Sequence, residues 1–72
     1  MNLILRYKKL GTDRFVQHEL DQEEYTLDEL QEWINNSIFY KNPLTLAGAE
    51  RRLIKFNPED MENISVLLEN DA

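Results

Sequence analysis

The side chains best suited to catalysis or metal binding are few and poorly grouped. The chain has one histidine, His18, and no cysteine. This composition excludes disulfides, thiolate zinc sites, cysteine nucleophiles and histidine-rich metal sites. His18 lies in a predicted strand without an evident serine or carboxylate partner, so a position on the strand surface is favoured over a role as a base. The carboxylates between Glu19 and Glu24 lack the glycine and the ligand spacing of an EF-hand loop.

Glycine-rich phosphate-binding loops are also missing from the sequence. The two glycines, Gly11 and Gly48, are too few and too far apart for a P-loop or a dinucleotide-binding loop. We therefore predict no catalytic residue, no metal site and no cofactor, and we do not expect an enzyme.

Charge is unevenly distributed along a chain whose formal net charge is −6. Basic residues gather in segments 6–14 and 41–55, whereas residues 15–40 hold no lysine or arginine and many carboxylates. The negative balance argues against a general nucleic-acid-binding character. An alternative remains, because four basic residues are predicted to project from one sheet face, where they could contact phosphates: Arg6, Lys8, Arg51 and Lys55. Pairing with acidic neighbours across the sheet is the favoured interpretation of these four.

The stretch from Tyr25 to Phe39 is predicted to be the amphipathic helix around which the chain is organised. Thr26 is the expected N-cap, with Glu29 placed to complete a capping box by bonding the cap backbone. Apolar residues recur behind the cap at helical spacing and define one buried face: Leu27, Leu30, Trp33, Ile34 and Ile38. We expect Trp33 to pack in the core, against Leu5, Tyr7, Ile54 and Phe56.

Strands are predicted at residues 2–9, 14–20, 44–47 and 50–56, from alternating apolar residues bounded by turn residues. The final segment is ambiguous. Asn57 and Pro58 form a strong helix start, and Met61, Ile64, Leu67 and Leu68 have helical spacing, whereas the alternation from Ile64 to Leu68 favours a strand. We prefer one helical turn over 58–61, followed by a strand over 64–69. The predicted fold is a single small α+β domain over residues 1–72, with one helix on one face of a four- to five-stranded antiparallel or mixed sheet.

One helix covers only one face of such a sheet. On the opposite face, Ile4, Leu53 and Leu67 are predicted to form an apolar strip rimmed by charge, which is typical of an interaction site. Because closed two-fold dimers are the commonest result of such a patch, we expect a homodimer or another protein partner. No apolar run approaches the roughly 20 residues of a membrane span, and Met1–Leu5 is too short for a signal-peptide core. No membrane association is expected, and a cytoplasmic protein is predicted.

The segment Arg52–Val66 (RLIKFNPEDMENISV) resembles the C-terminal ending of many small accessory proteins of phages and prophages. In those proteins a strand, an asparagine-containing turn and a closing strand follow one another. The resemblance implies a mobile-element accessory protein and supports a strand after Asn63. The leading prediction is a small cytoplasmic protein-interaction module, a phage- or prophage-derived regulator or inhibitor. The alternative is a nucleic-acid-binding accessory protein that uses the basic sheet face.

Overall fold

The computed structural model describes residues 2–69 of the chain. Its elements follow in the order β1 (Asn2–Lys9), β2 (Phe15–Leu20), α1 (Leu27–Tyr40), β3 (Leu44–Ala47), the short 3₁₀ helix η1 (Ala49–Arg51), β4 (Leu53–Phe56), the 3₁₀ helix η2 (Pro58–Asp60) and β5 (Met61–Glu69). The predicted α+β class, with a single α-helix packed against antiparallel strands, is confirmed for the described residues. The strands divide into two sheets, which the sequence did not indicate.

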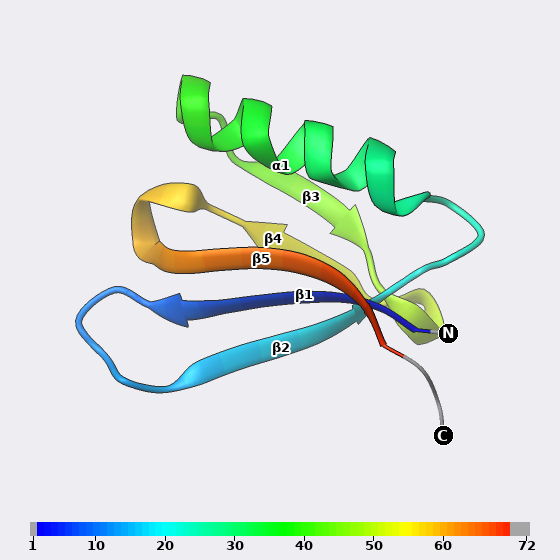
Figure 1. Ribbon diagram of the computed structural model, residues 1–72, viewed down its shortest axis with the longest axis horizontal. Coiled ribbons are helices and arrows are strands. Elements are labelled where there is room, and N and C mark those ends of the chain that lie inside the picture. The colour runs from blue at the N-terminus through cyan, green and yellow to red at the C-terminus, as the bar shows by residue number, and fades with distance from the viewer. Residues whose placement is uncertain (1, 70–72) are drawn as a thin grey trace.

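The larger sheet has the order β2-β1-β5, with β1 antiparallel to both neighbours (Figure 1). Leu3 on β1 lies opposite Leu20 on one side and Leu68 on the other. Alternation along β1 sends Leu3, Leu5 and Tyr7 to the side of α1, where all three are buried in the core. The central strand therefore ties the first, second and last elements into one layer.

The smaller sheet is the antiparallel ribbon β3–β4, which joins the larger sheet at one isolated bridge between Leu20 and Gly48. Beside this bridge the Asp21 N–H donates to the Ala47 carbonyl over 3.1 Å. A Cβ on residue 48 would stand 2.8 Å from Cδ1 of Ile54, which is closer than packed atoms allow. Any side chain at position 48 would therefore force the buried Ile54 side chain to move where the two sheets meet.

The core lies between α1 and the two sheets, with Leu30 and Ile34 contributed by the helix. The prediction that Trp33 packs in this core is wrong, because its side chain is 48% exposed. At 100° per residue, the buried positions 30, 34 and 37 form one stripe, and Trp33 lies to one side of it. Ser37 occupies the last buried position, and its hydroxyl donates to the Asn42 carbonyl.

Both ends of α1 are capped. The Thr26 hydroxyl oxygen accepts a hydrogen bond from the Glu29 N–H (3.2 Å), as predicted. The Glu29 carboxylate accepts from the Thr26 hydroxyl (3.0 Å) rather than from the cap backbone. At the other end Lys41 takes a left-handed conformation (φ 56°) and donates its N–H to the Ser37 carbonyl. This cap ends the helix one residue after the predicted Phe39.

The preferred interpretation of the final segment is confirmed, since η2 is followed by the strand β5. The strand begins at Met61, earlier than predicted, and Asn63 takes a left-handed conformation (φ 52°) where the pairing with β1 shifts register. In contrast, β4 begins at Leu53 rather than at residue 50. Glu50 and Arg51 have φ of 58° and 63°, which an extended strand cannot contain.

Candidate interaction surface

The apolar strip predicted on the open sheet face is only partly assembled. Ile4 and Leu67 are paired on β1 and β5 and share the face opposite α1. Ile4 is nevertheless only 4% exposed, with Leu67 on one side and Glu19 on the other. Leu53 is 77% exposed but lies on β4, in the separate ribbon. Because the three residues do not form one exposed surface, the homodimer loses its predicted geometric basis and stays a prediction.

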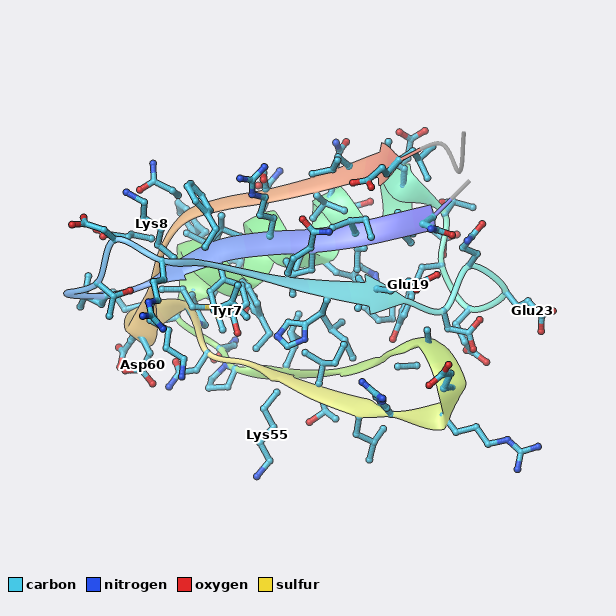
Figure 2. All side chains as sticks on the ribbon, turned by 90° about the horizontal axis from the view of Figure 1, so that it is seen from below. Tyr7, Lys8, Glu19, Glu23, Lys55 and Asp60 are labelled. Carbon is cyan, nitrogen blue, oxygen red and sulfur yellow. The ribbon has the colours of Figure 1, made fainter. Side chains whose placement is uncertain are left out.

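The four basic residues of the nucleic-acid alternative are also divided between the two sheets. Arg6 and Lys8 flank the Phe15 ring on the open face, with the Arg6 guanidinium carbon 4.3 Å and the Lys8 Nζ 5.3 Å from its centroid. Arg51 lies in η1 and Lys55 on β4. In Figure 2 the side chains of Lys8 and Lys55 point in different directions from β1 and β4.

The strand pairing also places carboxylates on the face that carries Arg6 and Lys8. Glu19 lies opposite Ile4, Glu69 opposite Asn2 and Glu62 opposite Lys8. The predicted basic face is therefore electrically mixed, and it has fewer cations than the alternation of strands suggested.

His18 lies on the inward side of β2, where it is half-buried, rather than on the strand surface as predicted. Its Nε2 and the Tyr7 hydroxyl share a hydrogen bond of 3.1 Å, and the two rings are 5.8 Å apart. Burial lowers the pKa of His18 and raises the pKa of Tyr7. In both groups burial disfavours the charged form.

The acidic connection before α1 forms a turn. The Asp21 carboxylate accepts a hydrogen bond from the Glu23 N–H over 2.9 Å. Residues 2–69 contain no group of three or more histidine, aspartate or glutamate side chains that could hold a metal ion together. The same residues include no helix whose length and apolar character would let it cross a membrane.

Three of the four exposed aromatic side chains of the described residues lie between Trp33 and the end of α1. We define the aromatic surface as Trp33, Phe39 and Tyr40, whose side chains are 48%, 77% and 65% exposed. The rings of Phe39 and Tyr40 meet edge to face at 4.8 Å, and Trp33 meets Tyr25 in the same manner at 5.8 Å. A shallow hollow of about 180 Å³ lies beside it, lined by Trp33, Asn36, Ser37, Tyr40, Asn42 and Leu44.

Sequence reasoning missed this surface because it assigned Trp33 to the core. A signal was present in the spacing. Trp33 and Tyr40 are seven residues apart, which places them on the same side of a helix. Phe39 and Tyr40 are adjacent and therefore about 100° apart, so the helix could not bury both beside Leu30 and Ile34.

Comparison with protein-family models, curated proteins and solved structures finds no match.

Acidic residues precede the aromatic surface along α1, and one lysine follows it directly. Asp28, Glu29 and Glu32 lie on α1, and residues 15–40 contain no lysine or arginine. Lys41, at the end of the helix, is the nearest cation in sequence. Two copies of this helix would bring like charges together, whereas a partner with a basic rim would be attracted.

Proposed function

We propose that the protein is a small protein-interaction module whose aromatic surface docks into an apolar site on another protein. The observation that carries the proposal is the exposure of three aromatic side chains within eight residues of one helix. Tyrosine and tryptophan are enriched among the residues that dominate binding energy at interfaces. A module that acts by occupying a partner's surface would serve as a regulator or inhibitor, a role that fits the class of phage accessory proteins that Arg52–Val66 resembles.

The partner's chemistry follows from the charge of α1. The acidic side chains on the helix favour a partner whose apolar site is bordered by lysine or arginine. They disfavour association of two copies through this helix, so we propose a different protein as the partner.

The aromatic surface is large enough to form the centre of an interface. At about 200 Å² per aromatic side chain, its exposed fractions amount to roughly 380 Å². Complete burial would contribute about 9 kcal/mol at ~25 cal/mol per Å², before the cost of association, which is of order 4–15 kcal/mol. A stable complex therefore also requires the polar rim around these residues, since standard interfaces bury about 800 Å² per partner.

The test is capture of partners from a lysate of the source cells by three immobilised forms of the protein. Wild type is compared with the double variant Phe39→Ser/Tyr40→Ser and with the control Leu10→Ser. Leu10 is 61% exposed in the turn after β1, so the control also removes an exposed apolar side chain. We expect a partner that wild type and the control retain and the double variant loses. Identical partners for all three forms would contradict the proposal.

Two alternatives, nucleic-acid binding and homodimer formation, are tested by separate measurements. The nucleic-acid alternative is supported by the two cations around Phe15, and it requires binding of DNA or RNA that weakens steeply with salt. Arg6→Glu/Lys8→Glu should then abolish that binding. A homodimer would appear as a mass that rises with concentration in light scattering, and Leu53→Lys would reduce it if the predicted residues form the contact.

A further inference from the structure

We propose that the outer edge of β5, together with the flank of α1 beside it, binds an extended basic segment of a partner protein as an added strand. This flank of α1 carries Gln31, Asn35 and Ile38. At 100° per residue it lies on the opposite side of the helix from Trp33 and Tyr40, so the site is separate from the aromatic surface.

One side of β1 is directed at β5. The Leu10 N–H, just after β1, donates to the Asp60 carbonyl, just before β5, over 2.9 Å. Backbone groups alternate in direction along a strand. The even-numbered residues of β1 therefore point their N–H and C=O groups toward β5. Ile4 lies directly opposite Leu67 in the register of the two strands, so these two residues bond one another.

The same alternation applies along β5. Ser65 and Leu67 bond β1, so the N–H and C=O groups of Val66 and Leu68 point away from the sheet. The pairing of the described strands gives this outer edge no neighbour. In Figure 2, β5 runs along one border of the larger sheet, and the β3–β4 ribbon lies beyond the opposite border. The outer edge of β5 is thus a row of backbone donors and acceptors open to another strand.

Side-chain burial marks the same edge as uncovered. Leu3 on β1 is 1% exposed, whereas Leu68, its partner on the same face of β5, is 44% exposed. Ile64 and Val66 are only partly buried as well. These apolar side chains lack a neighbour on their outer side, and an added strand would remove them from water.

A hollow beside this edge can receive the side chains of an added strand. Its volume is about 410 Å³, and it is lined by Gln31, Ile34, Asn35 and Ile38 of α1 and by residues 64–66 of β5. Ile38 is 41% exposed there. Side chains alternate between the two faces of a strand, so every second residue of the added segment would point into the hollow. Apolar residues suit these positions.

The other strand edges of the described residues are less accessible. The edge of β2 joins the β3–β4 ribbon at the isolated bridge, and the Tyr25 hydroxyl occupies the outward N–H of Ala47 on β3. Strand β4 is short and carries Lys55, and both features discourage strand addition. Residues 64–68 of β5, in contrast, include no charged residue and no proline.

The charge of β5 favours a basic partner segment over a second copy. The strand carries Glu62 and Glu69 and no lysine or arginine. Arg6 and Lys8 of the neighbouring β1 lie over the Phe15 ring, on the β2 side of the sheet. Two copies paired through β5 would bring acidic strands together, whereas a segment with lysine or arginine would be attracted. Backbone pairing of such a segment is recognition by strand addition.

The probe is a displayed library of random nine-residue peptides, the length of β5, selected on the immobilised wild-type protein. Selected peptides are titrated against Asn35→Arg and against the control Asn36→Arg. Both asparagines are exposed on α1, but only Asn35 lines the hollow beside β5. We expect Asn35→Arg to lose affinity by about tenfold or more, because the new side chain fills the hollow and repels a basic segment. Asn36→Arg should change it little, and the selected sequences should be rich in lysine and arginine.

Amide hydrogen exchange gives the deciding readout and contains its own control. The amides of Val66 and Leu68 should exchange rapidly in the free protein and become protected when a selected peptide is bound. The amides of Ser65 and Leu67, which bond β1, should be protected in both states. The proposal is overturned if no peptide is selected, if Val66 and Leu68 are already protected in the free protein, or if they stay unprotected in the complex.

Two comparisons distinguish this site from other modes of binding. The double variant Phe39→Ser/Tyr40→Ser should bind the selected peptides as wild type does. If that variant lost them while Asn35→Arg kept them, the peptides would occupy the aromatic surface and the proposal would fail. A light-scattering mass that rises with concentration for wild type but not for Asn35→Arg would assign the edge to a second copy, with the same consequence.

Discussion

The Tyr25 hydroxyl offers a sharp test of how this fold protects a strand edge. It accepts the Ala47 N–H over 2.9 Å, while the Tyr25 ring packs edge to face against Trp33. Tyr25→Phe removes the acceptor and keeps the ring, so the change isolates one hydrogen bond. Ala47 is half-buried, and its N–H would then be only partly hydrated.

The expected loss of stability is about 1 kcal/mol, the net worth of a typical hydrogen bond in a folded protein. In a domain of this size, 1 kcal/mol corresponds to a fall of roughly 4–8 °C in Tm. Tyr40→Phe is the matched control. The Tyr40 side chain is 65% exposed, and no described residue bonds its hydroxyl, so its Tm should not change.

Thermal unfolding and amide exchange of both variants make the measurement. The Ala47 amide should lose protection in Tyr25→Phe and keep it in Tyr40→Phe. If the Ala47 amide stayed protected in Tyr25→Phe, with a Tm equal to that of wild type, the assignment of Tyr25 as the cap of the β3 edge would be refuted.

Three further predictions concern the core, the single histidine and the junction of the sheets. Phe56→Ala should lower the free energy of unfolding, measured by urea denaturation, by about 3–5 kcal/mol, because Phe56 is fully buried. Trp33→Ala should lower it clearly less, because Trp33 is half-exposed. The reverse order would show that Trp33 is the core residue. Burial lowers the pKa of His18, so its NMR titration midpoint should lie below the usual ~6.5. As pH falls, His18 of the unfolded chain takes up a proton before His18 of the folded protein does. The stability that neutral His18 contributes is therefore complete above about pH 6.5 and lost below it. In His18→Gln this pH dependence should be absent. Gly48→Val should lower Tm by crowding Ile54, whereas an unchanged Tm would mean that the junction is loose.

The helix could be predicted because its signals are local. Thr26 and Glu29 mark its start, and the spacing of Leu30 and Ile34 marks its buried face, all within one segment. The final strand was predicted from the alternation after Asn63, another local pattern. Local patterns do not specify which side chains at the border of a helical face are covered. Trp33 was therefore misplaced, because its exposure depends on how the helix packs against the strands.

The division into two sheets depends on pairings between distant segments. Residues 50–56 read as one strand, but the left-handed conformations of Glu50 and Arg51 end the ribbon there. Neither glutamate nor arginine signals such a conformation, which glycine and asparagine usually provide. The placement of Leu53 and Lys55 away from Ile4 and Arg6 follows from this division. The predicted interaction and basic residues were consequently assigned to a common face that does not exist.

The pairing of β1 with β5 has a consequence for how the chain reaches its fold during synthesis. The hairpin partner of β1 follows after a short turn, but its second partner is the last described strand, about fifty residues further along. Closing the longer loop costs about 2 kcal/mol more than closing the hairpin, because loop entropy grows with the logarithm of loop length. A nascent chain can form the β1–β2 hairpin early. Until β5 emerges from the ribosome, one edge of β1 stays open, and the apolar side chains of Leu3 and Leu5 lack their cover from that side. The completed layer thus forms late, and during that interval the growing chain is exposed to aggregation.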